Sequence, residues 1–418
     1  MSLLVVGEAR NLARDATHLS IGQGFRLVIQ AAYFVLIARS LGPDAFGAFV
    51  TVVAMAALLG PFSGIGAPNL FIKNVRSGKR AAAICWGNGI LLIAISGTLL
   101  SILELVLSLT LRLKVPILVL ALVSVSDLIW LKVSELAASG FTALDRMSQT
   151  SIQSVVISLL RLIAIAWMMV MVLPVTLGRW AMVYLLTSLV GAAYAVLKGS
   201  QLWGRPLINI PALREDIAEG IYFSLAGSAT TVYNDIDKIM LNRLADLAAT
   251  GVYAAAYRVI DVTMTPVRSL AAAAYPQFFR KGVDGLSATY AYARTLIAGT
   301  FVYGSLTAAG LWLLAPALPY ALGSKYEAVV PAVRWLALIP FLRCIHSFLA
   351  DSLSGAGLQP LRTGIQVSAA LLNIGANLAV LPRYSWRGAA WTSLGCDGFL
   401  VVTFWFAVQY CRRKRLNN

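Results

Sequence analysis

The sequence predicts an all-α, polytopic membrane protein whose twelve transmembrane helices form two six-helix lobes, related by a parallel pseudo-two-fold repeat. Three observations predict this class: an apolar composition, twelve apolar stretches of spanning length, and a match between the two halves of the chain. Of the 418 residues, 59% are hydrophobic and only 12% are charged, whereas a soluble domain carries about 25% charged residues. A soluble fold of this size cannot bury so much apolar surface, so the bilayer is the expected solvent.

The apolar stretches follow one another along the chain, each near the ~20 residues that a helix needs to cross a bilayer. In order they lie at 18–40, 45–69, 82–111, 116–141, 150–174, 178–199, 218–242, 250–276, 289–319, 329–354, 361–382 and 388–410. The longest connection falls near the middle of the chain. The sequence therefore predicts an N-terminal lobe at 1–200, a cytoplasmic linker at 201–217 and a C-terminal lobe at 218–418.

The charge of the loops predicts the orientation. The net charge is +16, and the excess Lys and Arg are scattered between the apolar stretches. This distribution argues against a nucleic-acid-binding domain. With the N-terminus inside, the inner loops hold about twice as many Lys and Arg as the outer loops, as the positive-inside rule requires. Both termini are therefore expected in the cytoplasm.

Two pairs of segments match between the halves: 38–52 with 242–256, and 139–146 with 354–362. The first pair aligns Arg39 with Arg243, Gly47 with Gly251, and Phe49 with Tyr253. Because six helices are an even number, both halves keep one orientation, and the repeats are parallel about an axis along the membrane normal. Such architectures predict a substrate site between the halves and transport by alternating access.

Metal and cofactor chemistry is not indicated. The four cysteines show no paired spacing and the chain has only two histidines, so we expect no disulfide framework, no metal site and no cofactor. The stretch "TTVYNDIDKIMLNR" at 230–243 contains the D-x-D pattern of metal-dependent glycosyltransferases, in Asp235 and Asp237. On a regular helix these carboxylates project about 200° apart, so they cannot grip one metal ion.

Polar stripes run along several predicted helices. Ser224, Ser228, Thr231, Asp235, Lys238 and Asn242 form one such stripe on the seventh helix. A charge at the bilayer centre costs about 2.5–3.5 kcal/mol, so these groups must face one another or water. Stripes in both halves predict a hydrated central cavity.

The charged residues in the polar stripes have two interpretations. Some are i,i+3 neighbours that neutralise one another locally: Asp235 with Lys238, Arg258 with Asp261, and Lys132 with Glu135. Others have no acidic residue three or four positions away: Arg26, Arg161, Arg268 and Arg343. Either a distant helix neutralises each of these arginines or an anionic ligand does, and a guanidinium suits phosphate.

Glycine and proline predict breaks within two helices. The stretch "LLGPFSGIGAP" at 58–68 interrupts the second helix, and "VTMTPVRSL" at 262–270 interrupts the eighth. Such breaks are tolerated where a cavity or a neighbouring helix satisfies the freed carbonyl groups.

Several stretches resemble the polysaccharide-transporter branch of the multidrug/oligosaccharidyl-lipid/polysaccharide exporter superfamily. They are "LIARSLGPDAFGAFVTVVA", "SGIGAPNLFIKNV", "NDIDKIMLNRLADLAATGVYAAAYRVIDV", "AAYPQF" and "LSGAGLQPLRTGIQVSAALLNIGANLAVLPRYSWRGAAWTS". By position, Asp237, Gly251, Tyr253 and Arg258 match the family's second-half pattern, and Arg26 lies where a basic residue is common.

The resemblance implies a flippase, not an enzyme, for undecaprenyl-diphosphate-linked oligosaccharide repeat units in a bacterial inner membrane. It would act in O-antigen, capsule or exopolysaccharide synthesis, among membrane lipids and beside a glycan polymerase and a chain-length regulator. We expect a cationic cavity to hold the substrate through Arg26, Gln30, Arg161, Lys238, Arg258, Arg268 and Arg343. Coupling to H⁺ or Na⁺ would use Asp127, Asp235 and Asp261.

Three other functions stay open. An ion-coupled multidrug exporter of the same superfamily would favour unpaired acids in its cavity. A membrane-embedded glycan polymerase or ligase would show a long outer loop with catalytic side chains, which this sequence lacks. A scaffold for a synthesis complex would hold buried ion pairs and no continuous cavity.

Overall fold

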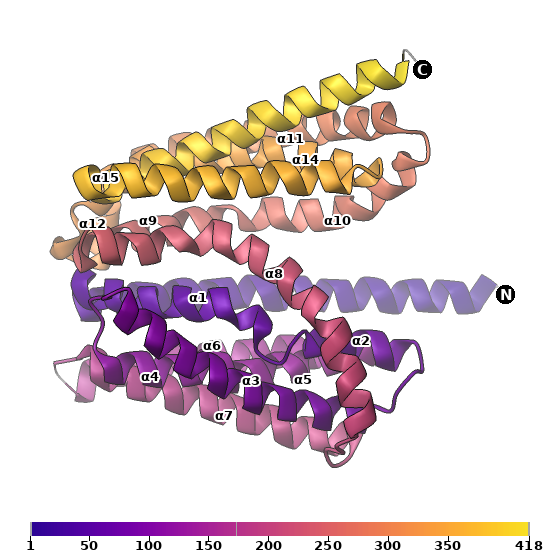
Figure 1. The fold of residues 1–418 in the computed structure, drawn as a ribbon, viewed down its shortest axis with the longest axis horizontal. Coiled ribbons are helices and arrows are strands. Elements are labelled where there is room, and N and C mark those ends of the chain that lie inside the picture. Colours follow the sequence, from indigo (N-terminus) through magenta and orange to yellow (C-terminus); the bar gives the residue numbers. More distant parts are fainter. Residues whose placement is uncertain (1, 173, 417–418) are drawn as a thin grey trace. The chain divides into compact units, whose positions relative to one another are not determined.

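The computed structural model describes the backbone of residues 2–172 and 174–416, and the side chains of residues 27–172, 174–225, 228, 231 and 235–413. All regular structure in this part of the chain is helical (Figure 1), which confirms the predicted all-α class. The chain divides into two compact units. Unit 1 comprises Met1–Leu41 and Ala48–Ile239, and unit 2 comprises Gly42–Gly47 and Met240–Asn418.

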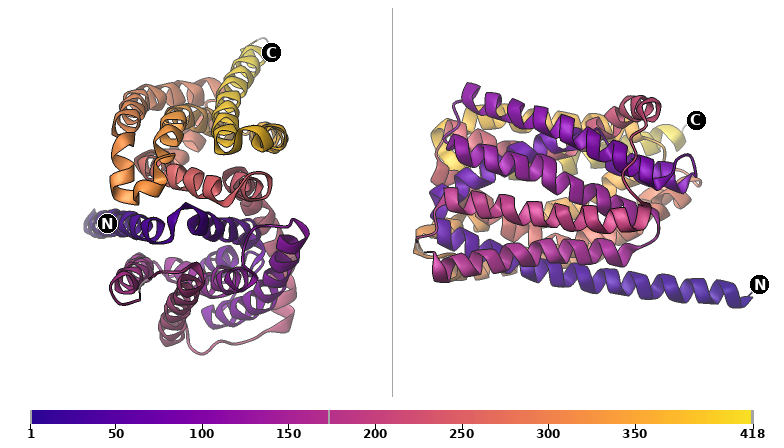
Figure 2. Two further views of the ribbon diagram at one scale, coloured as in Figure 1. Left: turned by 90° about the vertical axis from the view of Figure 1, so that its left-hand side faces the viewer. Right: turned by 90° about the horizontal axis from the view of Figure 1, so that it is seen from below.

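Unit 1 is built from long helices that lie side by side, as α3, α4, α6 and α7 show in Figures 1 and 2. Its elements are α1 (Ser2–Leu59, broken at Gly42), η1 (Gly60–Phe62), α2 (Ala67–Arg76), α3 (Ala82–Thr110), α4 (Ile117–Val125), the π-turn η2 (Ser126–Trp130), α5 (Leu131–Ala143), α6 (Met147–Met171), α7 (Leu177–Trp203) and most of α8 (Ile210–Leu244).

Unit 2 holds the remaining helices, with α14 packed between α11 and α15. Its elements are α9 (Leu247–Thr263), α10 (Thr265–Gly282), α11 (Leu286–Leu314), η3 (Ala315–Ala317), α12 (Leu318–Leu322), η4 (Ser324–Tyr326), α13 (Val329–Leu336), α14 (Ile339–Gly355) and α15 (Gln359–Leu416, broken at Ser385).

Among the described residues, eight helical stretches are long and apolar enough to cross a membrane. Two of them, Leu27–Arg76 and Gln359–Arg413, have 50 and 55 residues, and each contains a helix break, at Gly42 and Ser385. Divided at these breaks, and taken together with α8 and the α9–α10 pair, the helices follow the twelve predicted stretches in order. The chain is therefore a multi-pass membrane protein.

Both predicted helix breaks are confirmed. The first lies between η1 and α2, where Gly64, Ile65 and Gly66 have φ of 77°, 46° and 68°. There the Gly64 N–H donates to the Ser96 hydroxyl at 2.8 Å. The second lies at Met264, just before Pro266, and the Tyr303 hydroxyl donates to the carbonyl of Thr263 at 2.5 Å. Neighbouring helices thus satisfy backbone groups at both breaks.

The segment predicted as a linker is largely helical. Between α7 and α8 only residues 204–209 are non-helical, and they are tied to the start of α3. The Leu207 N–H donates to the Ala83 carbonyl at 3.0 Å, and Asn88 exchanges two hydrogen bonds with the backbone of Asn209. The division into lobes at 201–217 stays a prediction.

Candidate functional site

Two clusters of buried and half-buried polar side chains, one inside each unit, contain predicted site residues. The unit-1 cluster consists of Asp127, Arg161, Tyr184 and Ser188. The unit-2 cluster consists of Tyr257, Arg343, His346 and Asp397. Each therefore combines a carboxylate, a guanidinium and a tyrosine in an apolar helix bundle, where a polar group needs a partner.

In the unit-1 cluster, one tyrosine joins the acid to the base. The Tyr184 hydroxyl on α7 donates to Oδ1 of the buried Asp127 at 2.8 Å. The guanidinium of Arg161 on α6 lies 3.9 Å from the centre of the Tyr184 ring. It also donates to the Ser188 hydroxyl at 3.0 Å, while its buried Nε has no hydrogen-bond partner among the described residues. One guanidinium donor therefore stays unsatisfied inside the cluster.

Asp127 lies on the π-turn η2, which interrupts the α4–α5 helix. A π-turn adds a residue to one helical turn and is frequent at functional sites. The Ser63 hydroxyl, at the break before α2, donates to the carbonyl of Leu128 at 2.5 Å. Gly97 of α3 comes so close that a Cβ there would lie 2.5 Å from the same carbonyl oxygen. Packing on two sides therefore holds the irregular turn in place.

Aromatic rings enclose the unit-1 cluster. Phe49 meets Tyr184 edge-on at 5.2 Å between ring centres, and Trp180, which is 0% exposed, lies 6.1 Å from Tyr184. Tyr33 on α1 lies 5.7 Å from Trp180. Such rings leave little room for Tyr184 to move, so the bridge between Asp127 and Arg161 is rigidly placed.

In the unit-2 cluster, two side chains from one face of α14 hold a fully buried carboxylate. Asp397 on α15 is 0% exposed. It accepts from Arg343 Nε at 3.3 Å and contacts His346 Nε2 at 3.2 Å. Arg343 also donates to the Tyr257 hydroxyl of α9 at 3.4 Å. The carboxylate and the guanidinium therefore neutralise each other.

The two clusters place their acid and their base on different helical stretches of the two halves. The matched segments 139–146 and 354–362 begin 215 residues apart, and this shift carries Asp127 to Leu342, next to Arg343. The fourth helical stretch thus contributes the acid of the cluster in the first half and the base in the second half. The matched segments at 38–52, 139–146, 242–256 and 354–362 do not include these positions, so the repeat does not predict this inversion.

The predicted local ion pairs have different outcomes. Lys238 pairs with Asp235 on α8, and Lys132 pairs with Glu135 at 2.7 Å, so both i,i+3 predictions are confirmed. The predicted pair of Arg258 with Asp261 is wrong. Asp261 instead binds Arg268, whose Nη2 lies 2.9 Å from its Oδ1. Arg258 is exposed on α9 and forms no ion pair with a described side chain.

The arginines without nearby acids are mostly neutralised from a distance. Arg268 reaches Asp261 across the break at Met264, and Arg343 reaches Asp397 on another helix. The prediction of neutralisation by a distant helix is thus confirmed for Arg343, whereas the partner of Arg268 lies only seven positions away in the predicted eighth helix. Arg161 has no ion pair within 4 Å among the described residues and rests on Tyr184. The side chain of Arg26 lies outside the described residues, and Gln30 is half-buried on α1.

The structure brings Asp127 together with Arg161, Asp235 with Lys238, and Asp261 with Arg268. Sequence reasoning missed Tyr184, Tyr257 and His346, which complete the two clusters. The described residues contain no group of three or more His, Cys, Asp or Glu side chains that could hold a metal ion. α8 runs as one helix from Ile210 to Leu244. On such a helix the side chains of Asp235 and Asp237 point in different directions, as the sequence predicts.

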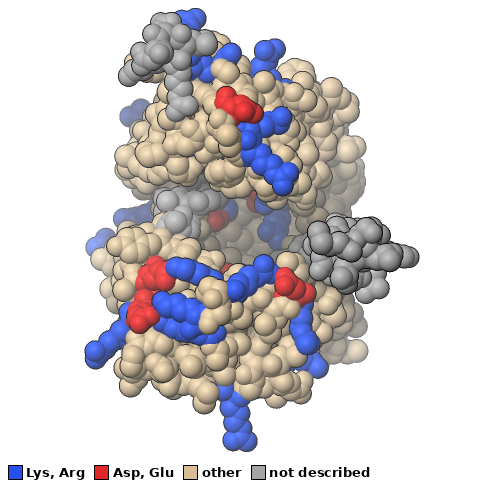
Figure 3. Space-filling view, turned by 90° about the vertical axis from the view of Figure 1, so that its right-hand side faces the viewer, with Lys and Arg blue, Asp and Glu red and all other residues tan. Residues whose placement is uncertain are grey.

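One end of unit 1 carries a network of ion pairs between α2, the turn after it and α8. Arg80 binds Asp216 and Glu215, Lys79 binds Glu215 at 3.2 Å, and Lys73 binds Glu219. The lower part of Figure 3 shows acidic and basic side chains side by side on one face of the molecule. Hydrogen bonds and charge from Lys79 and Arg80 lower the pKa of Glu215. These ion pairs hold the start of α8 against α2 and the turn that follows it.

Comparison with known proteins identifies related sequences and folds. The family described as polysaccharide biosynthesis protein matches residues 12–281. An inward-facing multidrug resistance MATE family transporter of the MOP superfamily has a TM-score of 0.74 and 14% identity, covering 93% of this chain and 96% of that chain. No curated protein matches the chain significantly.

Two further solved structures share the fold. Lipid II flippase MurJ, in an inward closed conformation, has a TM-score of 0.74 and 13% identity, covering 94% of this chain and 87% of that chain. A MOP superfamily transporter from Pyrococcus furiosus Vc1 has a TM-score of 0.64 and 16% identity, covering 96% and 95%. At these identities the likeness establishes the fold.

Proposed function

Since the chain belongs to the polysaccharide biosynthesis protein family, we propose that it is a flippase for undecaprenyl-diphosphate-linked oligosaccharide repeat units. It would move them across a bacterial inner membrane, with both termini in the cytoplasm, for O-antigen, capsule or exopolysaccharide synthesis. A glycan polymerase and a chain-length regulator would act on the exported units. The shared fold with lipid II flippase MurJ supports this class of cargo.

The observation that supports the proposal most directly is an excess of positive charge among the predicted site residues, once the ion pairs between them and their neighbours are counted. Each candidate coupling acid has a donor partner: Asp127 has Tyr184, Asp235 has Lys238, and Asp261 has Arg268. Among the predicted cavity arginines whose side chains are described, Arg161 and Arg258 have no carboxylate within ion-pair distance. The surplus is cationic, and guanidinium donors bind phosphate oxygens in pairs.

In the proposed mechanism, the diphosphate-sugar head enters the hydrated cavity that the polar stripes predict and displaces water from the guanidiniums. Arg258, which is exposed, is then the first donor to the diphosphate, joined by Arg26, Arg161, Lys238, Arg268 and Arg343. Gln30 would hydrogen-bond the sugar. The polyprenyl tail stays in the bilayer while the lobes rock, and protonation or Na⁺ binding at Asp127, Asp235 or Asp261 would drive an uphill flip.

A bacterial strain that lacks its own copy of the gene tests the proposal. The wild-type chain should restore surface glycan, and Arg258→Ala should lower export about tenfold or more, because a charged hydrogen bond contributes about 1.5–3 kcal/mol. Arg294→Ala is the matched control, since Arg294 is also exposed and forms no ion pair with a described side chain. Protein amounts in the membrane are measured for each variant.

The chemical form of the retained glycan distinguishes the alternatives. Loss of a flippase leaves lipid-linked repeat units on the cytoplasmic side, whereas loss of a polymerase leaves single units on the outer side. Unchanged surface glycan without the chain, combined with export of cationic dyes that depends on Asp127, would contradict the proposal and favour a multidrug exporter.

A further inference from the structure

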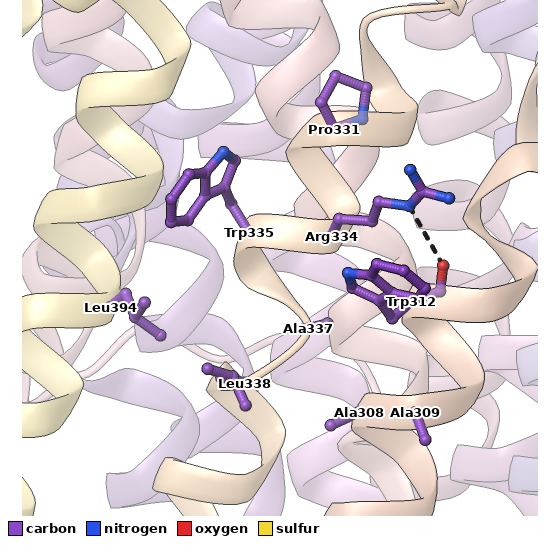
Figure 4. Close-up of a pocket in the computed structure, with 9 residues that line it drawn as sticks. All are labelled: Ala308, Ala309, Trp312, Pro331, Arg334, Trp335, Ala337, Leu338 and Leu394. Atoms are coloured by element: carbon purple, nitrogen blue, oxygen red, sulfur yellow. Dashed lines mark hydrogen bonds between the residues drawn. The ribbon is translucent and has the colours of Figure 1, made fainter.

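Unit 2 contains a pocket of about 570 Å³ between α11, α13 and the second part of α15 (Figure 4). Its walls include Ala309, Trp312, Trp335, Leu338 and Leu394, and its single charged group is Arg334. The volume falls within the range of about 300–1,000 Å³ that is usual for ligand sites. A pocket that is apolar except for one guanidinium fits an amphiphile with one anionic end.

Arg334 is held in place with its outer donors unused. Its guanidinium carbon lies 4.6 Å from the centre of the Trp312 ring, and its Nε donates to the Trp312 carbonyl at 3.3 Å. Neither terminal nitrogen has a hydrogen-bond or carboxylate partner among the described residues. Figure 4 shows these nitrogens pointing away from the carbonyl, above the indole. The arginine is therefore pre-organised to bind a further acceptor.

The surroundings place the pocket near the surface of the bilayer. The lining residues of α11 lie in the last two turns of that helix, which ends at Leu314, and those of α13 lie near the start of the spanning stretch Val329–Gly355. Trp335 meets Trp391 edge-on at 5.8 Å, and Trp391 lies 5.2 Å from Tyr384. Tryptophan and tyrosine concentrate at membrane–water interfaces. A ligand at this depth has its charged group near the lipid headgroups and its apolar part among acyl chains.

We propose that this pocket binds an anionic phospholipid of the surrounding bilayer. The phosphate accepts from the two terminal nitrogens of Arg334, since a guanidinium fork matches two phosphate oxygens. One acyl chain lies along Trp335, Leu338 and Leu394. A small soluble anion would leave these apolar walls in water, and a neutral apolar molecule would leave the guanidinium desolvated without a partner. The lipid site stands apart from the proposed transport function.

Native mass spectrometry of the full-length protein in detergent, with added phosphatidylglycerol or phosphatidylcholine, tests the site. The wild type should retain phosphatidylglycerol in preference to phosphatidylcholine, because the phosphate of phosphatidylcholine is offset by its own quaternary ammonium group and attracts a guanidinium less. Arg334→Gln should weaken phosphatidylglycerol binding about tenfold, the effect of losing one charged hydrogen bond. Arg387→Gln is the control, because Arg387 also stacks on a tryptophan, Trp386 at 5.2 Å, but does not line the pocket.

A second variant tests the apolar part. Ala309→Trp fills the pocket without changing its charge, and it should reduce the retention of phosphatidylglycerol while the protein keeps its wild-type unfolding temperature. Equal binding by wild type and Arg334→Gln would overturn the proposal. So would equal retention of both lipids, or an equal loss in Arg387→Gln, which would indicate general attraction to a basic surface.

Discussion

Gly47 and Gly251, which are equivalent residues in the two halves of the chain, pack against each other's helical turn. A Cβ on Gly47 would lie 2.0 Å from the carbonyl oxygen of Leu247, and a Cβ on Gly251 would lie 2.0 Å from that of Pro43. Leu247 follows Pro43 by the same 204 residues that separate the glycines. The contact is therefore reciprocal, like the self-complementary contact of a two-fold dimer.

Substitution of either glycine by alanine should destabilise the protein to a similar degree. The atoms in the way are backbone oxygens within helices, which cannot move aside as a side chain can, and overpacking costs about 1–3 kcal/mol. Thermal unfolding in detergent measures the effect for Gly47→Ala and Gly251→Ala. Gly364→Ala is the control, because a Cβ there meets nothing within 4 Å. Unfolding temperatures equal to that of the control would show that the two turns can separate.

Tyr184 should stabilise unit 1 through both its hydroxyl and its ring. Tyr184→Phe leaves the buried Asp127 without its donor, which costs about 1–3 kcal/mol. Tyr184→Leu also removes the ring beneath Arg161, a further loss of about 0.5–2 kcal/mol. Unfolding temperatures should fall in the order wild type, Tyr184→Phe, Tyr184→Leu. Tyr194→Phe on the same helix should have no effect, and a Tyr184→Phe protein as stable as this control would contradict the bridge.

The contributions of Asp397 and Arg343 to the free energy of unfolding should be coupled. Asp397→Asn leaves a buried guanidinium without its counter-charge, which typically costs about 3–5 kcal/mol. Adding Arg343→Met removes the orphaned charge, so the double variant should be more stable than Asp397→Asn alone. A double-mutant cycle on the free energy of unfolding measures this coupling. Additive effects would mean that His346 alone stabilises the carboxylate.

Glu215 should make the α2–α8 end of unit 1 sensitive to acid. Its pKa is lowered by Lys79 and Arg80, so its contribution to stability is complete above the ordinary value of 4.5 and is lost as pH falls through the lowered value. Between neutral and acidic pH, the unfolding temperature of Glu215→Gln should therefore change less than that of the wild type.

The comparison variant for this pH series is Glu327→Gln, because Glu327 is exposed and has no ion pair with a described side chain. Its unfolding temperature should follow the wild-type profile. If Glu215→Gln and Glu327→Gln gave the same profile, the ion pairs seen at this end would not contribute to stability in solution.

Local patterns predicted the features that depend on one helix at a time. The apolar stretches predicted the spans, Gly and Pro predicted the breaks at 58–68 and 262–270, and helical spacing predicted the Lys132–Glu135 and Asp235–Lys238 pairs. The repeat was also recognised in the sequence, because small residues such as Gly47 and Gly251 are needed where two helix backbones approach closely. The use of the candidate residues in substrate binding stays a prediction.

Only the tertiary structure decided which charges meet. Helical periodicity shows which face of a helix is polar, but it does not show which helix lies opposite. Arg343 therefore finds Asp397 from 54 positions away, and Arg161 shares Tyr184 with Asp127. Arg268, not Arg258, pairs with Asp261 across the helix break at Met264. The amino-acid sequence by itself determined the helices, their breaks and their repeat, whereas packing between helices determined the partners of the buried charges, because those contacts join residues that no local spacing relates.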